Sequence, residues 1–144
     1  MEINMKILRF LVLSVIPLIF LNSMAAAESI IVANKTVTQT SVSKEDVELI
    51  FLGKKKKWDN GEMIRLAALK KGAVNETFLR EYVNKNSSSY RSFWKIAVVS
   101  GTARPPKFFK DEEDLVEYVA EKEGAIGYIS FGTPHEGLKI LDIE

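Results

Sequence analysis

The sequence predicts an α/β fold, with a mixed, mostly parallel sheet flanked by helices. Short runs of apolar residues alternate along the chain with segments in which apolar residues recur at helical spacing. Such alternation is typical of sheets whose strands are connected through helices. The 144 residues, of which 47% are hydrophobic and 27% charged, suffice for one globular domain with a core. This single domain is expected to cover residues 28–144.

The first 27 residues have the pattern of a secretory signal peptide. Lys6 and Arg9 form a positive start, an apolar run follows over residues 10–21, and Ala25–Ala27 supplies the small residues of a cleavage site. A retained membrane anchor is the alternative, but a proline interrupts the run, and crossing a bilayer takes about 20 apolar residues. Cleavage near Ala27 is therefore expected, giving a periplasmic protein without a stable membrane anchor.

Charge and composition exclude several kinds of partner and site. The signal segment carries two of the 20 basic and one of the 19 acidic residues, so the remaining chain has no net charge. Nucleic-acid binding is not expected, because it depends on an excess of Lys and Arg. With no cysteine and one histidine, His135, the chain offers no disulfide and no zinc cluster. No metal, cofactor or catalytic pair of nucleophile and base is expected, so the protein is not predicted to be an enzyme.

The first predicted elements are a strand and a capped helix. Residues 29–35 contain adjacent β-branched residues, which predict a strand buried on both faces, as strands of parallel sheets are. Residues 36–42 form a polar connection. Ser43, with Asp46 three positions later, marks a helix start, and Gly53 marks the helix end.

A basic loop follows this helix and leads to a second strand. Lys54–Lys57 precede Trp58 and an Asp-Asn-Gly turn, after which residues 63–69 form an apolar strand. The lysines are favoured as a solvated loop, with docking to an anionic membrane surface as the alternative. Trp58 is as consistent with a core position as with a binding groove.

Two helices follow the second strand. The first begins after Gly72, and residues 84–89 form a polar link to the second. In the second helix, apolar residues from Tyr90 to Val98 recur at the spacing of one helical face. Trp94 lies within this stripe and is therefore favoured as a core residue.

The last part of the domain contains a loop, a helix and two strands. Residues 102–110 include two adjacent prolines and are expected to be an extended loop. Asp111–Asp114 begin the last helix, and four consecutive acidic residues favour a helix start over a cation site. Strands are predicted over residues 125–130 and 138–143.

Four short motifs recur in one known family. They are Ile31–Lys35 (Ile-Val-Ala-Asn-Lys), the run Ile50–Gly61, Phe93-Trp94 followed by a glycine, and Gly124–Tyr128 (Gly-Ala-Ile-Gly-Tyr). Together they resemble the phosphate-type (class II) periplasmic substrate-binding proteins of ABC transporters, over nearly the whole domain. In the last motif, glycines allow the backbone to pass close to a neighbouring helix or a ligand. Members of this class have two lobes and about twice this length, so the resemblance implies one lobe.

The resemblance also implies a position for a ligand. In this family, a Ser-Gly-Thr motif ahead of a helix holds an oxyanion through hydroxyls and unpaired backbone N–H groups. The matching place here lacks both hydroxyls, although lysines, an asparagine and a threonine nearby can supply charge and polar contacts. Plain helix capping by these residues is the alternative. The candidate ligand-binding residues are Lys71, Gly72, Ala73, Val74, Asn75 and Thr77.

The function implied by the resemblance is that of a secreted solute-binding module, which binds phosphate or another small oxyanion for ABC-type uptake. A single lobe cannot enclose a small ligand, so the expected partners besides the anionic solute are an ABC permease, a second lobe or a second copy. The alternative is a periplasmic protein–protein interaction module that has lost ligand binding, since one fold serves many functions.

Overall fold

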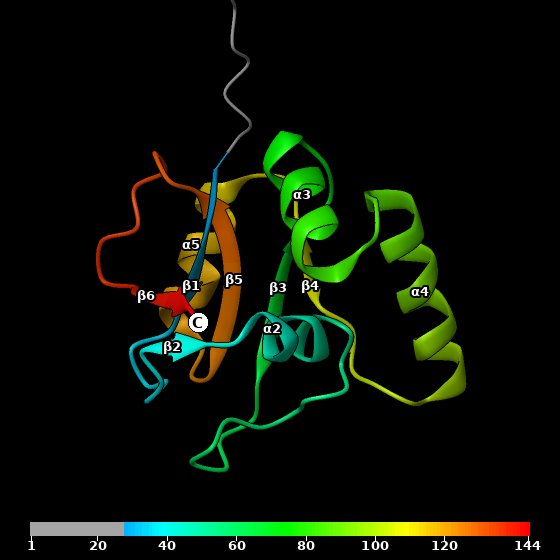
Figure 1. Ribbon diagram of the computed structural model, residues 1–144, viewed down its shortest axis with the longest axis horizontal. Helices are drawn as coiled ribbons and strands as arrows, with labels where there is room; N and C mark the ends of the chain where they lie inside the picture. Colours follow the sequence, from blue (N-terminus) through cyan, green and yellow to red (C-terminus); the bar gives the residue numbers. More distant parts are fainter. Residues whose placement is uncertain (1–27) are drawn as a thin grey trace, which may run out of the picture.

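The computed structural model describes residues 28–144, which fold around one six-stranded sheet (Figure 1). The predicted signal peptide lies outside the described residues. From one edge of the sheet to the other, the strands are β2 (Ser41–Val42), β6 (Lys139–Ile143), β1 (Ser29–Ala33), β5 (Ala125–Ser130), β3 (Arg65–Leu69) and β4 (Lys107–Phe109). Three of the five neighbouring pairs are parallel, namely β2–β6, β3–β5 and β3–β4. The predicted α/β class and mixed, mostly parallel sheet are confirmed.

Helices cover both faces of this sheet. They are α2 (Lys44–Phe51), α3 (Ala73–Phe78) with its π-helical continuation η1 (Leu79–Val83), α4 (Ser87–Ser100) and α5 (Glu112–Glu121). Successive residues of β5 point to opposite faces of the sheet, so their contacts show which helix lies on which face. Tyr128 stacks on Phe78 of α3, whereas Gly127 lies against Leu115 of α5. No helix within residues 28–144 is long and apolar enough to cross a membrane.

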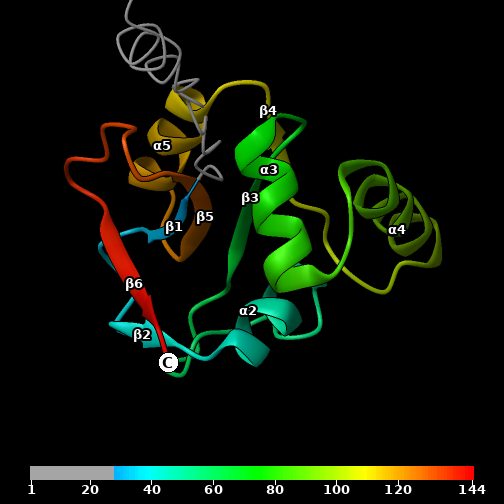
Figure 2. The same ribbon diagram turned by 45° about the horizontal axis from the view of Figure 1, so that its top comes forward.

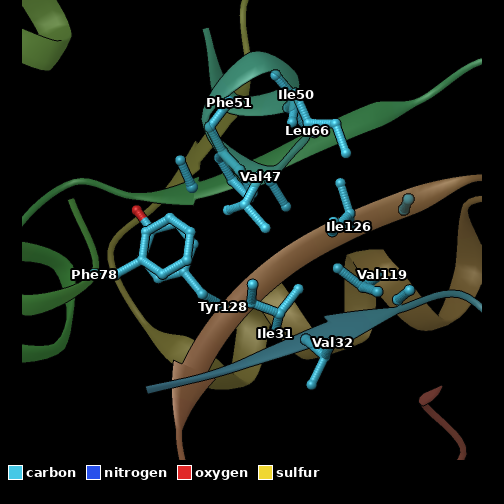
Figure 3. Packing of buried hydrophobic residues seen from close by; sticks show 14 of the residues in the cluster. Ile31, Val32, Val47, Ile50, Phe51, Leu66, Phe78, Val119, Ile126 and Tyr128 are labelled. Carbon is cyan, nitrogen blue, oxygen red and sulfur yellow. The ribbon is translucent and has the colours of Figure 1, made fainter. Parts of the chain in front are cut away.

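The core lies between the sheet and the helices on each side. Figure 3 shows Phe51 and Phe78 gathered around Tyr128, with Val119 of α5 on the other side of the strands. The ring centroids of Phe78 and Tyr128 are 3.8 Å apart, and those of Phe51 and Phe78 are 4.9 Å apart. Trp58 and Trp94 are both about 2% exposed and belong to this core.

Helix α2 begins after Ser43 and ends before Gly53, as the sequence predicts. The Ser43 hydroxyl accepts a hydrogen bond of 3.0 Å from the N–H of Asp46, which satisfies one otherwise free donor of the first turn. At the other end, Gly53 has a φ of 70°, in the region that glycine adopts without strain. The predicted start and end of this helix are confirmed.

Three expectations about other elements need correction. β1 is antiparallel to both β5 and β6, so its burial reflects its place inside the sheet and not parallel pairing. The predicted loop over residues 102–110 contains β4, which pairs with β3 at the sheet edge. Helix α4 starts at Ser87 behind an Asn86 capping box, within the predicted polar link. The first two corrections concern pairing with distant segments, whereas the start of α4 is marked by a local capping box between Asn86 and Ser89 that the prediction missed.

The Gly-Ala-Ile-Gly-Tyr motif passes close to its neighbours, as its glycines predict. A Cβ atom at Gly127 would lie 2.8 Å from Cδ2 of Leu115 in α5. A Cβ atom at Gly124 would lie 2.2 Å from the backbone oxygen of Met63. Neither position has room for a side chain, so strand β5 can pack closely against helix α5 and the segment before β3.

Candidate solute-binding site

A hollow of about 470 Å³ opens where the parallel strands β3, β4 and β5 end, at the top of Figure 1. Residues 71–74 after β3, 110–113 after β4 and 132–134 after β5 line it. Ligands of open α/β sheets bind beyond the carboxyl ends of parallel strands, so this edge is the natural place for a site.

The start of α3 presents free backbone donors at this hollow. Gly72 is the N-cap, and its φ of 109° is a conformation that residues with a side chain rarely adopt. No side chain caps the helix, and the first intrahelical bond runs from the N–H of Glu76 to the Gly72 oxygen at 3.0 Å. Within the described residues, the N–H groups of residues 73, 74 and 75 therefore have no acceptor.

Four of the six predicted ligand-binding residues lie together at this hollow. Lys71, Gly72 and Ala73 are exposed, Val74 is half-buried, and all four line the hollow. A Cβ atom at Gly72 would meet no atom within 4 Å, so the space in front of the helix start is open.

The other two predicted residues, Asn75 and Thr77, do not line the hollow. Asn75 is 1% exposed, and its Nδ2 donates to the Ser87 hydroxyl at 2.7 Å, while its Oδ1 accepts from the Tyr128 hydroxyl. Thr77 is half-buried, one turn further along the helix. Asn75 is thus held inside the protein, and Ala73 and Val74 are the residues of the first turn that face the hollow.

A buried polar network fixes the position of this helix start. The Tyr128 hydroxyl accepts from the N–H of Leu69 at 3.1 Å and donates to Asn75, which in turn contacts Ser87. The carboxylate of Glu76 accepts from the hydroxyl and the N–H of Ser87, which joins α3 to the start of α4. Burial raises the pKa of Tyr128 far above its usual range, so the hydroxyl stays protonated and can donate. The sequence gives no direct signal for this network beyond the tyrosine that ends the glycine motif.

The charges around the hollow are mixed. Lys71 and Lys110 supply positive charge, whereas Asp111 and Glu113 add carboxylates. Glu112 also lines the hollow, and its carboxylate accepts the N–H of Ser130. Because an ionised carboxylate can only accept hydrogen bonds, it disfavours a fully ionised anion beside it and tolerates one that carries a proton.

The remaining candidate residues serve the structure. Trp58 Nε1 donates to the Gly124 oxygen at 2.9 Å, which ties the basic loop to the glycine motif. His135 is half-buried, with its Nδ1 2.7 Å from the Thr133 oxygen. Asp111 is the N-cap of α5, and no group of acidic or histidine side chains in residues 28–144 is arranged to hold a metal ion.

Solved structures of transport proteins share the fold of this chain. An ABC-type phosphate transport receptor from Vibrio cholerae aligns with 80% of this chain and 45% of its own, with a TM-score of 0.62 and 14% identity. PstS from Borrelia burgdorferi aligns with 81% of this chain and 47% of its own, with a TM-score of 0.60 and 16% identity. This chain therefore spans less than half the length of either protein.

Comparison at the level of sequence identifies no relative. No protein-family model and no curated protein matches the sequence. At the identities given above, likeness in structure establishes the fold alone. The sheet order, the helices on both faces and the half-length alignment together show that this chain has the fold of one lobe of the phosphate ABC transporter substrate-binding proteins.

Proposed function

We propose that this protein is a periplasmic solute-binding module in which the start of α3 binds a small oxyanion. The observation that carries the proposal is the pair of backbone N–H groups of residues 73 and 74, which line the hollow and have no acceptor among the described residues. Unpaired donors and the positive end of a helix dipole both favour negative charge. α3 continues into η1, so the helical segment spans residues 73–83 and has a dipole longer than one turn.

The composition of the hollow favours phosphate among the small oxyanions. Lys71 and Lys110 supply countercharge, and the carboxylates of Asp111 and Glu113 are acceptors. Phosphate keeps a proton near neutral pH and can donate it to a carboxylate, whereas sulfate is fully ionised and cannot. The name of one fold neighbour, the ABC-type phosphate transport receptor from Vibrio cholerae, agrees with this choice of solute.

A bound solute on this lobe alone stays partly exposed to water. The hollow is an open one at the surface, whereas pockets that bind small ligands tightly cover most of the ligand. The proposed module therefore acts with a second lobe, supplied by a second copy, by another protein or by an ABC permease. Export through the predicted signal peptide places it in the periplasm.

A proline at the first helical position tests the proposed role of the α3 donors. Ala73→Pro removes one N–H at a position where helices accept proline, so the fold is expected to persist. Phosphate at about 100 times its dissociation constant is expected to stabilise the parent protein by about 2.7 kcal/mol. In the variant, the affinity is expected to fall about tenfold to a hundredfold, since a hydrogen bond to a charged group contributes about 1.5–3 kcal/mol. Thermal unfolding with and without phosphate measures both values.

The matched control is Ala73→Ser, which keeps the N–H, and sulfate at equal ionic strength is the matched anion. Phosphate should raise the melting temperatures of the parent protein and of Ala73→Ser, which both keep the N–H of residue 73. Sulfate should raise them less than phosphate does. The proposal fails if millimolar phosphate leaves the melting temperature of the parent protein unchanged.

The second candidate function is a protein–protein interaction module. Helix α4 lies at one side of the fold in both Figure 1 and Figure 2, and its Tyr90 packs against Phe108 of β4. Its last turns expose Ile96 (68%), Val98 (51%) and Val99 (89%). Val98 and Val99 also line a groove that includes Phe108. Neighbouring apolar residues at this exposure are typical of surfaces that contact another protein.

Light scattering separates the two functions. A monomer that dimerises only when phosphate is added supports solute binding, and a dimer that forms without ligand supports the interaction module. If α4 makes that dimer, Val99→Asp is expected to convert it to monomer, because burying an unpaired charge opposes association. Asn60→Asp adds the same charge at an exposed position outside α4 and should leave the dimer intact.

A further inference from the structure

A second cleft, of about 460 Å³, lies at the beginnings of strands β3 and β4, whereas the α3 hollow lies at their ends. It is formed by the loop after α2, the beginnings of β3 and β4, and the loop after α4, at the lower end of the molecule in Figure 1. We call it the basic cleft, because five cationic side chains and no carboxylate line it: Lys55, Lys56, Arg65, Arg104 and Lys107.

The fold assembles these cations from three separate segments. Lys55 and Lys56 belong to the lysine run Lys54–Lys57. Arg65 and Lys107 are the first residues of the adjacent strands β3 and β4. Arg104 lies in the loop that leads into β4. The lysine run alone is typical of a solvated loop, but a convergence of cations from distant segments on one concave surface is not explained by solubility.

The walls of the basic cleft are tied together. Lys56 Nζ donates to the Thr102 oxygen at 2.9 Å, and the Lys56 oxygen accepts from the N–H of Ile64 at 3.0 Å. Where the loop after α2 begins, a Cβ atom at Gly53 would lie 2.6 Å from Trp94 and 2.8 Å from Ala103. The two loops are therefore in close contact, and the cleft is preformed.

Most of this positive charge is not neutralised within residues 28–144. Lys55 pairs with Asp46 at 2.9 Å and lies 3.8 Å from Asp59. Arg65 and Arg104 have no ion-pair partner among the described residues. Neighbouring cations repel one another, and a bound anion removes that repulsion.

Apolar residues form the remainder of the lining. Met63 is exposed, and Ile64 and Tyr118 are half-buried, so these three offer apolar surface to a ligand, with Ile50, Leu66 and Pro106 buried behind them. The volume lies within the range of small-molecule sites, roughly 300–1,000 Å³, which such apolar lining with a few polar groups typifies. A simple inorganic ion would leave this apolar part of the lining unused.

We propose that the basic cleft binds a small organic anion that joins a phosphate or carboxylate group to an aromatic or aliphatic part. The charged group binds to Arg65 and Arg104, and the apolar part contacts the apolar lining. This site is separate from the one at α3, and it stands whether or not α3 binds an oxyanion.

Phenyl phosphate is the probe, added to isotope-labelled protein purified after export, with amide chemical shifts as the measurement. Saturable shifts are expected for residues that line the basic cleft, such as Gly53, Arg65 and Thr102. Inorganic phosphate should shift them less, because it lacks the apolar part. Shifts confined to residues 72–75, no shifts, or shifts that do not saturate in the millimolar range overturn this proposal, and the first of these supports the α3 site.

Paired substitutions test the role of the two arginines. Arg65→Gln with Arg104→Gln is expected to weaken phenyl phosphate binding at least about tenfold, because two charge-assisted contacts are lost. The control is Lys57→Gln with Arg80→Gln, which changes the net charge equally at exposed residues that do not line the cleft. Unchanged amide spectra away from the substitutions verify the fold. An equal loss in the control would show that overall charge, not the cleft, attracts the probe.

Discussion

Gly124→Ala is expected to lower the free energy of unfolding by about 3 kcal/mol or more, through backbone strain and overpacking together. The residue has a φ of 72°, which a side chain makes unfavourable. Its Cβ atom would lie 2.2 Å from the backbone oxygen of Met63, which cannot rotate away as a side chain can. The Gly124 oxygen accepts from Trp58 Nε1 at 2.9 Å and from the N–H of Arg65 at 3.2 Å, so the backbone cannot shift without breaking these bonds.

Urea unfolding of Gly124→Ala and of Gly61→Ala measures how much the close packing of Gly124 against Met63 contributes to the free energy of unfolding. Gly61 has a similar φ of 85°, but no atom lies within 4 Å of the position of its Cβ. The control therefore carries the conformational strain without the clash, and should cost about 1–3 kcal/mol. Equal losses in the two variants would mean that the close packing at Gly124 does not contribute to stability.

Tyr128→Phe is expected to lower the free energy of unfolding by about 2–4 kcal/mol, because each buried group left unpaired costs about 1–3 kcal/mol. The ring stays, stacked on Phe78, so the variant removes only the hydroxyl. Its loss leaves the N–H of Leu69 and the Oδ1 of Asn75 without their partner. Since Asn75 belongs to the first turn of α3, the response to phosphate should weaken as well.

Tyr118→Phe is the control, because the Tyr118 ring is half-buried and its hydroxyl is not part of the network of Leu69, Asn75, Ser87 and Tyr128. Its cost should stay within about 0.5 kcal/mol, as for most surface changes. A Tyr128→Phe variant as stable as this control would contradict the role given to the network.

The pH dependence of stability gives an independent measurement of the same hydroxyl. Burial raises the pKa of Tyr128 in the folded protein, whereas the unfolded chain titrates near the usual tyrosine value of about 10. The contribution is thus complete below the unfolded pKa and is lost as pH rises above it, because only the unfolded state releases the proton readily. Tyr128→Phe should make the alkaline loss of stability less steep. Burial also raises the pKa of Tyr90. Part of the alkaline loss of stability therefore remains in the variant.

Elements whose ends are marked by local chemistry were predictable. Ser43 accepts a bond from the N–H of Asp46 three residues later, and glycines at positions 53 and 72 adopt positive φ where a helix ends or begins. These signals depend on neighbouring residues only, so they can be recognised in the sequence. The last strands were likewise found at nearly their true bounds, because a glycine turn and an apolar run mark them.

Features that depend on distant contacts were not predictable. β4 has three residues and no period of its own, and it is a strand because β3 lies beside it. The antiparallel pairing of β1 is set by segments about a hundred residues away. The basic cleft has the same origin, since Arg65 and Arg104 are separated in sequence and meet only in the folded chain.

The candidate site shows the same division. The sequence placed a helix start after Gly72, and residues 71–74 do line the hollow. It did not show which way Asn75 faces, because the direction of a side chain in the first turn depends on what packs against the helix. Tyr128 and Ser87, the partners that hold Asn75 inside, come from β5 and from the start of α4.

The pairing of β1 also determines when the protein can fold. Both neighbours of β1 in the sheet, β5 and β6, lie at the far end of the chain, with Ser29 opposite Ser130. Pairings between such distant segments form late, because a long loop must close first. A chain emerging from the ribosome therefore keeps its first strand unpaired until nearly all of it has been made. The sheet is therefore completed only after β5 and β6 have been synthesised.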